Sequence, residues 1–453
     1  MITERNLKVK KYVTLILALL LFDGTAFANN LNYADLSFWK NFNDEILIEN
    51  LLQVYENNND LKTAVLKVNE ANRVVKMSFA NELPHIGFEG YVGRIFKSSD
   101  EVFGSITIPN YSETRYYLPL TMNYEIDIWG QNHLRTKSKK KQLEMIKQDE
   151  RTSYIYISSA FAADYFNLIR CDKLIEYQLS LIALQEQVIN SYKTRYEFGT
   201  ATLSDIDNSK KNLTYMKEDL HKLYEKQDVL KNQMSTLLGD RSFENIKRTN
   251  FDELDINLQI PEGIDFDMLS QRPDRIKSEL NLERIGIDVK VAQRDFLPKF
   301  IITGNMGFNM YNISSSHKFL ADLGIVPVWD IFMGGRKIQL LKLKKDEYEM
   351  AVQKYEKVLL TSIQETNDAL FGIKTSENIK NIANERLNTD IKELGYTQIK
   401  CDAGTADNLD LIIQEEKMLL SKKMYVSSQI NEIISALNLY QALGGVDFTK
   451  NTL

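Results

Sequence analysis

The chain has 453 residues, more than one ordinary compact core accommodates, so several domains or an elongated structure are expected. Apolar residues make up 43% and the mean hydropathy is −0.31, which excludes a membrane protein built from many apolar helices. The formal net charge of −6 gives no support for nucleic-acid binding. Only seven prolines and 20 glycines occur, so long uninterrupted elements are expected.

The N-terminus has the pattern of a secretory signal peptide. A lysine-rich stretch precedes an apolar run over residues 12–22, which is too short to span a bilayer as a helix, and an Ala-x-Ala cleavage motif ends at Ala28. We therefore predict a signal peptide over residues 1–28 and a mature chain that begins at Asn29. An uncleaved membrane anchor is the alternative. No cysteine follows the apolar run, so a lipid anchor is not expected.

The mature chain reads as two copies of one unit, because several short segments match in the same order. The matching pairs are the stretch from Asp60 to Pro84 with that from Asp274 to Pro298, Asp127–Trp129 with Asp330–Phe332, Gly199–Ala201 with Gly404–Ala406, and Leu238–Gly239 with Leu443–Gly444. We predict a first repeat over residues 29–255 and a second over residues 256–453. Each repeat has the order helix, strand, strand, long helix, turn and helix.

The first helix of each repeat is expected to stop at a Leu-Pro pair, at Pro84 and at Pro298, because proline lacks a backbone donor and disfavours helix in the residue before it. Apolar and polar residues alternate in the strands that follow, as in a strand with one apolar face. The apolar positions are Leu118, Leu120, Met122, Tyr124, Ile126 and Ile128 in the first repeat, and Phe300, Ile302, Met306, Phe308 and Met310 in the second. Loops over residues 97–114 and 312–317 are expected to join each pair of strands.

The alternation by itself is ambiguous, because a soluble sheet with one solvated face shows it too. Two features favour strands that cross a membrane. The strands are about ten residues long, which suffices to cross a bilayer, and their polar face carries Glu125, Asp127 and several asparagines, as beside a water-filled lumen. Four strands cannot close a barrel, and lipid does not tolerate an open sheet edge, so several chains would have to share one barrel.

A long helix follows the strands of the first repeat. Apolar residues recur every seven positions at Tyr154, Phe161, Leu168, Ile175, Ile182, Ile189 and Tyr196, with a parallel seam at Leu174, Leu181 and Val188. Sustained heptads predict helices that pack as in a coiled coil. A helix from about Trp129 to Phe198 would be roughly 100 Å long at 1.5 Å per residue. Cys171 and Cys401 both lie in helical stretches and are expected to be free thiols, with a structural disulfide between them as the alternative.

A set of short motifs resembles those of the TolC-like outer-membrane efflux proteins, closest to the OprM/NodT branch. In chain order the motifs are Phe38–Asp44, Asn59–Leu61, Tyr124–Gly130, Arg272–Asp274, Phe296–Pro298 and Phe332–Arg336. The resemblance covers nearly the whole mature chain. It implies an α+β membrane protein of the cell outer membrane, in which long helices form a coiled-coil α-barrel tunnel through the periplasm. The tunnel would join a shared 12-stranded transmembrane β-barrel.

The resemblance also implies partners. Three identical chains would form a homotrimer in contact with outer-membrane lipid, and each would give four strands to the barrel. A periplasmic adaptor (membrane fusion) protein and an inner-membrane transporter of the resistance-nodulation-division type would dock at the helical end. The chain would then be the exit duct of a tripartite efflux pump. No nucleic acid, cofactor or metal is expected, and the four histidines have no metal-ligand spacing.

The turn between the two long helices of each repeat is the candidate periplasmic entrance. Gly199 and Gly404 can adopt positive φ and let the chain reverse. Asp205 and Asp410 each stand six residues after the glycine, and in a trimer each would form a ring of carboxylates that attracts cations. The resemblance places entrance aspartates at this spacing, more firmly at Asp410, whereas the family's next aspartate falls on Ile413. The alternative is that both aspartates favour the nearby helix N-termini.

Other functions are weighed against the efflux duct. An enzyme is not expected, because no zinc-protease, P-loop or nucleophile-elbow motif occurs. A duct of the same fold in a type I protein-secretion system would be distinguished by its inner-membrane partner. A periplasmic coiled-coil scaffold would fractionate without detergent. The sequence does not name the cargo.

Overall fold

Residues 37–453 form one structural unit, and the signal peptide predicted over residues 1–28 lies outside the described residues. The described residues also include neither the predicted start at Asn29 nor the predicted repeat boundary at residues 255 and 256, so both stay predictions. The computed structural model describes residues 36–97, 101–103, 106–108, 111–240, 246–254, 266–311 and 316–451.

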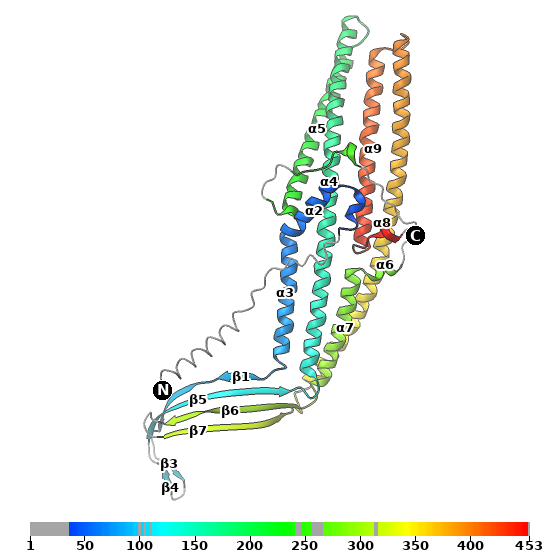
Figure 1. The fold of residues 1–453 in the computed structure, drawn as a ribbon. Coiled ribbons are helices and arrows are strands. Elements are labelled where there is room, and N and C mark those ends of the chain that lie inside the picture. Colours follow the sequence, from blue (N-terminus) through cyan, green and yellow to red (C-terminus); the bar gives the residue numbers. More distant parts are fainter. Residues whose placement is uncertain are drawn as a thin grey trace. The chain divides into compact units, whose positions relative to one another are not determined.

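Two matching sets of helices make up most of this unit (Figure 1). The pairs are α3 (Asn59–Ala80) and α7 (Pro273–Arg294) with 22 residues each, α4 (Gln131–Glu197) and α8 (Arg336–Asp402) with 67 each, and α5 (Leu203–Leu238) and α9 (Asn408–Ala442) with 36 and 35. At 1.5 Å per residue α4 and α8 are each about 100 Å long. The predicted order of elements is confirmed, and α4 agrees with the predicted helix to within two residues at each end.

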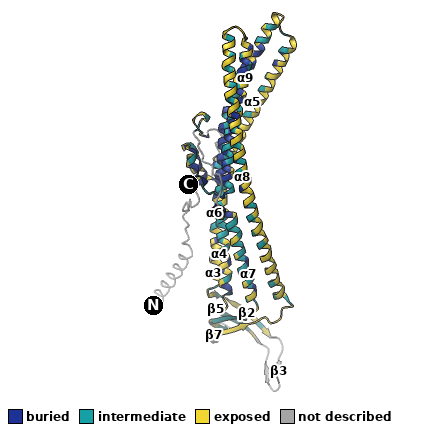
Figure 2. Cartoon of the chain, turned by 90° about the vertical axis from the view of Figure 1, so that its right-hand side faces the viewer, coloured by how far each residue is buried: buried dark blue, intermediate teal, exposed yellow. Residues whose placement is uncertain are grey.

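Helix α4 lies between the other helices, whereas α8 lies on a flank. Extensive contacts join α4 to α3, α5, α7 and α9, while α8 contacts α7 and α9. The described part of α4 has 24 buried residues and that of α8 has five, and Figure 2 shows α8 largely exposed along its length. Most of the predicted heptad positions are buried, but Tyr196 at the end of the helix is exposed. The side of α8 away from α7 and α9 is therefore available to another molecule.

Several short helices and a group of aromatic residues complete this unit. These helices are η1 (Trp39–Phe42), α2 (Glu45–Asn57), η2 (Phe251–Glu253), α6 (Phe266–Ser270) and η3 (Phe448–Asn451). The ring of Phe38 stacks on Tyr440 at a centroid distance of 4.1 Å. Asp44 caps α2 by accepting from the Leu47 amide at 3.0 Å, and its other oxygen accepts from the Tyr165 hydroxyl at 2.7 Å. Burial raises the pKa of Tyr165, so this hydroxyl stays protonated and donates.

The strands form an antiparallel sheet that continues from the helix ends (Figure 1). Its strands are β1 (His85–Phe88), β2 (Tyr91–Lys97), β5 (Tyr111–Ile126), β6 (Lys299–Tyr311) and β7 (Ser316–Val328). β1 and β2 pair with the same side of β5, so the sheet has four strand positions, the first of them interrupted. The interruption lies opposite Pro119, which has no backbone donor for the ladder. Pro119 also faces Gly307, where any side chain would meet the backbone of β5.

The loop predicted over residues 97–114 is wrong in part. β5 already begins at Tyr111, and two short strands, β3 (Glu101–Phe103) and β4 (Ile106–Ile108), pair with each other within this stretch. Backbone pairing with β2, whose Lys97 lies opposite Tyr111, extends β5 into the predicted loop. β7 likewise begins at Ser316, inside the second predicted loop over residues 312–317.

Candidate functional site

The sheet has one apolar face and one mainly polar face. The register places Leu118 opposite Phe308, and Phe308 opposite Phe319, so that these side chains share a face, and the last two rings are 5.4 Å apart. The predicted alternation is confirmed within β5 and β6, because most of their apolar positions pair with each other, as Leu120 does with Met306. The predicted strand position Ile128 lies beyond the end of β5. Large apolar residues exposed on such a face fit a lipid environment better than water.

The opposite face aligns polar side chains across three strands. Thr121 faces Asn305, which faces Asp322, and the Asn305 amide donates to the Asp322 carboxylate at 3.0 Å. Lys299 lies 3.5 Å from the Glu125 carboxylate on the same face. A row of hydrogen-bonding and charged groups is the lining expected beside water.

Both edges of the sheet are open among the described strands. β1 and β2 pair on one side with β5, and β7 pairs on one side with β6. β7 is a long edge strand of 13 residues with exposed apolar residues, among them Leu323 at 77% exposure. Such an edge is a template for pairing with another strand. The single chain therefore presents an incomplete sheet.

The first candidate entrance turn joins α4 to α5. Gly199 has a φ of 72°, and the following Thr200 amide donates to the Arg195 carbonyl at 2.8 Å, which ends α4 and reverses the chain. The side chain of Thr202 caps α5 by accepting from the Asp205 amide at 3.3 Å. In return the Asp205 carboxylate accepts from the Thr202 amide at 2.8 Å and from its hydroxyl at 2.7 Å. These hydrogen bonds hold the pKa of Asp205 below its ordinary value.

The second candidate entrance turn joins α8 to α9 and has the same backbone. Gly404 has a φ of 71°, and the Thr405 amide donates to the Lys400 carbonyl at 2.9 Å. Asp407 caps α9 by accepting from the Asp410 amide at 3.0 Å, and the Asp410 carboxylate accepts from the Asp407 amide at 3.2 Å. Both predicted aspartates thus occupy the same position of a capping box. The helix-terminus role expected as the alternative is present, and it leaves the predicted entrance role open.

An ion pair between Arg195 and Asp407 joins the two turns, and sequence reasoning missed both of these residues. No local pattern marks the pair, because its members are 212 positions apart. Below it a buried apolar cluster joins α4 to α9 through Leu181, Leu184, Val188, Leu409, Ile412 and Leu419. Ile413, the position at which the resemblance implies a further aspartate, packs against this cluster at the junction of the two hairpins.

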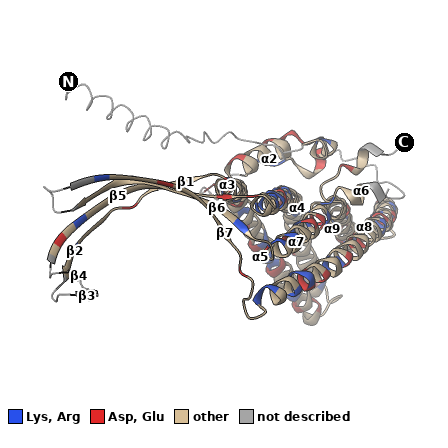
Figure 3. Ribbon diagram, turned by 90° about the horizontal axis from the view of Figure 1, so that it is seen from below, with Lys and Arg blue, Asp and Glu red and all other residues tan. Residues whose placement is uncertain are grey.

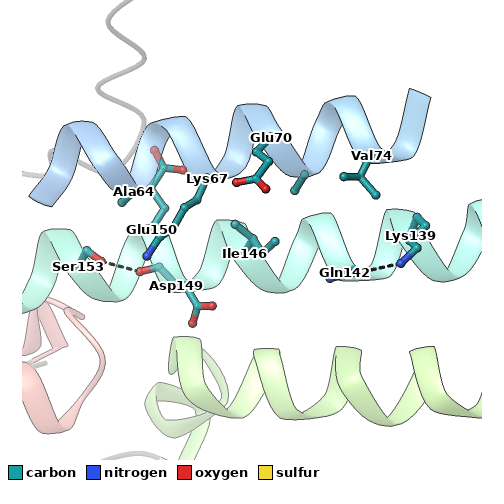
Figure 4. Close-up of a pocket in the computed structure, with 11 residues that line it drawn as sticks. Ala64, Lys67, Glu70, Val74, Lys139, Gln142, Ile146, Asp149, Glu150 and Ser153 are labelled. Atoms are coloured by element: carbon teal, nitrogen blue, oxygen red, sulfur yellow. Dashed lines mark hydrogen bonds between the residues drawn. The ribbon is translucent and has the colours of Figure 1, made fainter. Parts of the chain in front are cut away.

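Cavities also occur along the helices, away from the turns. One of about 430 Å³ lies between α3 and α4 (Figure 4). Its walls alternate in charge, with Lys67 and Lys139 against Glu70, Asp149 and Glu150. Burial raises the pKa of Glu150, which is the innermost carboxyl of this cavity.

Other observations bear on chemistry and on membrane spans. Within the described ranges no helix is long and apolar enough to cross a bilayer. In the same part of the chain no three or more histidine, cysteine or acidic side chains gather in a way that could hold a metal ion. Cys171 is buried, Cys401 is partly exposed, and both are free thiols, as predicted.

Paired long helices together with a sheet of one apolar and one polar face define a TolC-like outer-membrane channel fold. The sequence model described as "Outer membrane efflux protein" matches residues 50–240 and 267–445. The chain belongs to this family.

Named relatives agree with the family. The chain is 22% identical over 424 residues to the cation efflux system protein CusC of Escherichia coli O157:H7, covering 90% of this chain and 88% of the relative. It is 22% identical over 420 residues to the toluene efflux pump outer membrane protein TtgC of Pseudomonas putida, covering 90% and 84%. Among solved structures, the CmeC outer membrane channel of Campylobacter jejuni has a TM-score of 0.81 at 20% identity, covering 92% and 89%. The outer-membrane channel OprN has a TM-score of 0.80 at 20% identity, covering 91% and 93%.

Family membership confirms the predicted function in its general form. The protein is an outer-membrane channel of the bacterial efflux systems, and its family is not enzymatic. As the outer-membrane component of an efflux system it works with pump partners.

Proposed function

We propose that three copies of this chain close one barrel of 12 strands and one helical tunnel, and so form the exit duct of a tripartite efflux pump. The observation that carries this is the open sheet, with four strand positions, two unpaired edges and one exposed apolar face. Unpaired backbone groups are costly in lipid, so β7 of one copy has to pair with β1 and β2 of the next. Three copies give twelve strand positions.

The helices support the same assembly. The exposed side of α8 carries large apolar residues, such as Leu360 and Phe371, each 70% exposed. At the opposite end of the helix row, α3 exposes Met77 at 69% and α5 exposes Tyr215. Packing α8 of one copy against α3 and α5 of the next would bury both sets. Each apolar side chain that becomes covered in this way stabilises the assembly by about 25 cal/mol per Å² of apolar area removed from water.

The two turns would form the periplasmic entrance of the tunnel. With three copies, Asp205 and Asp410 would each provide a ring of three carboxylates around the pore axis, which repels anions and attracts cations. The capping hydrogen bonds do not compete with this role. A carboxylate can accept about four hydrogen bonds, and Asp410 is exposed to solvent. Gly199 and Gly404 set the turns that place these aspartates.

The same turns would receive a periplasmic adaptor protein, through which an inner-membrane transporter of the resistance-nodulation-division type supplies cargo. The first turn exposes Phe198 at 79% and also Leu203, side chains that are better covered than left in water. The names of the relatives cover efflux of cations and of toluene. We infer that the pump chooses the cargo and that the duct provides the path.

Membrane extraction with and without detergent, followed by the native mass of the solubilised protein, tests the proposal. A detergent-dependent species of three chains is the expected result. A stable single chain in detergent, or a protein released without detergent, would rule out the shared barrel.

A further inference from the structure

A second groove, of about 760 Å³, lies between α4, α7 and α8. Each of the three helices contributes one lysine to its walls, namely Lys137, Lys290 and Lys345. Apolar side chains of α7, including Leu282 and Ile287, and the ring of Tyr348 line the rest. The groove thus combines an apolar surface with three ammonium groups that come from separate helices.

These ammonium groups have no acidic partner in the part of the chain that the structure describes, and all three residues are exposed. Glu283, on the groove wall, is paired with Lys141, so Glu349 is the remaining acidic residue of the lining. The cavity between α3 and α4 is different, because its basic residues are matched by acidic ones (Figure 4). The groove between α4, α7 and α8 therefore has a net positive charge, because three lysines face Glu349 as the remaining acidic residue.

The groove lies close to the point where strands become helices. Lys137 is six residues into α4, Lys345 is nine residues into α8, and Lys290 is four residues before the end of α7. At 1.5 Å per residue these positions are about 6–14 Å from the helix ends. Figure 3 shows Lys and Arg frequent on the helices and sparse on the sheet.

Aromatic side chains mark the same junction. Trp129 and Trp329 each donate from the indole to a backbone carbonyl of the turn before β6, at 2.7 and 3.1 Å, and both remain exposed. Phe332 is 87% exposed. Exposed tryptophan and phenylalanine at the end of a membrane sheet are typical of the bilayer interface, and the polar headgroup layer there is roughly 5–8 Å thick. Long lysine side chains extend this reach further.

We propose that this groove binds the phosphate-bearing head of an anionic phospholipid from the leaflet next to the helices. The inference rests on the proposed placement of the sheet in the membrane. Three lysines converge on one phosphate as point charges, and the apolar wall contacts the glycerol and the first acyl carbons. A free phosphate ion would use the charges but not the apolar wall.

Native mass spectrometry of the full-length protein in detergent, after addition of phosphatidylglycerol, tests the proposal. The wild type is expected to retain the lipid, and the triple variant K137Q/K290Q/K345Q to bind it about 100-fold more weakly, from roughly fivefold per lysine. The matched control is K357Q/K374Q/K392Q, which removes three exposed lysines from α8 outside the groove and should bind as the wild type does. The arginine triple K137R/K290R/K345R keeps the charge and should also retain the lipid.

Three outcomes would overturn the proposal. These are equal binding of phosphatidylcholine, an equal loss in the control triple, and displacement of the lipid by inorganic phosphate at comparable concentration. The assembly is checked separately by the native mass and ion conductance of each variant. A conducting oligomer that does not retain the lipid refutes the groove alone, whereas a protein that neither assembles nor conducts refutes the proposed channel.

Discussion

The turn between α4 and α5 and the turn between α8 and α9 share one backbone but differ in their side chains. Gly199 and Gly404 have φ values within one degree of each other, and a threonine hydroxyl follows each and donates to the helix end, at 3.0 and 3.1 Å. The N-cap, however, is Thr202 in one turn and Asp407 in the other. A few backbone requirements therefore set the reversal of the chain, while the charge and the contacts of the side chains at the tip differ between the two halves.

The largest effect is expected from removing the N-cap of the second turn. Asp407 accepts from two backbone amides and also pairs with Arg195, whereas the Thr202 side chain accepts from one amide. Asp407→Ala should therefore cost about 1–2 kcal/mol of local stability, and Thr202→Ala about 1 kcal/mol or less. Hydrogen exchange of the first turn of α9 should speed up roughly 5- to 30-fold in the first variant and less in the matching turn of α5 in the second.

Arg195→Gln distinguishes the two roles of Asp407, which caps α9 and pairs with Arg195. It removes the ion pair and leaves the cap, and an exposed pair of this kind contributes roughly 0–1 kcal/mol. If Arg195→Gln destabilises the second turn as much as Asp407→Ala does, the ion pair rather than the cap holds this turn, and the comparison with Thr202 fails.

The next effect concerns the charge of the second turn. Asp410→Ala should raise ion conductance in a planar bilayer by at least roughly twofold and reduce block by cations, because a ring of carboxylates at a constriction binds cations. Asp205→Ala should act in the same direction. Asp402→Ala, which changes an exposed carboxylate at the end of α8, is the matched control and should leave conductance unchanged.

Asp410→Asn distinguishes the pore role from the capping role. The amide oxygen still accepts from the Asp407 backbone, but the charge is gone. Conductance like that of Asp410→Ala means that the charge acts in the pore. Conductance like that of the wild type means that Asp410 matters as part of the cap, and the entrance proposal is wrong for this residue.

The smallest effect is the pH dependence of the first turn. The pKa of Asp205 is lowered by the hydrogen bonds from Thr202, so the carboxylate stabilises the folded turn above the ordinary pKa of 3.8. That contribution is lost as pH falls below 3.8 through the lowered pKa. Hydrogen exchange of the turn between pH 5 and 3, corrected for intrinsic rates, should show this loss. Thr202→Val, which removes the hydroxyl, should move the loss to higher pH, and an unchanged profile would contradict the assignment.

Local patterns predicted the elements, because they depend on neighbours in sequence. The heptads predicted α4, the alternation of apolar and polar residues predicted the two faces of the sheet, and Gly199 and Gly404 each predicted a turn. Features that depend on contacts distant in sequence were missed. The loop over residues 97–114 is partly strand because β2 pairs with it, and the ion pair of Arg195 with Asp407 joins different halves. The groove between α4, α7 and α8 is likewise formed by helices that are distant in sequence and that the fold brings together.

The equal lengths of α4 and α8 have a consequence for how this chain can vary. Both helices have 67 residues and begin next to the sheet, so the helical lengths that lead to the two turns match. An insertion in one helix alone would shift one turn along the axis and separate Arg195 from Asp407. Tolerated changes in length are therefore expected to come in pairs, in both halves, and in steps of seven residues or about 10 Å, which preserve the packing face. The length of the long helix in one repeat therefore constrains the length of its counterpart in the other.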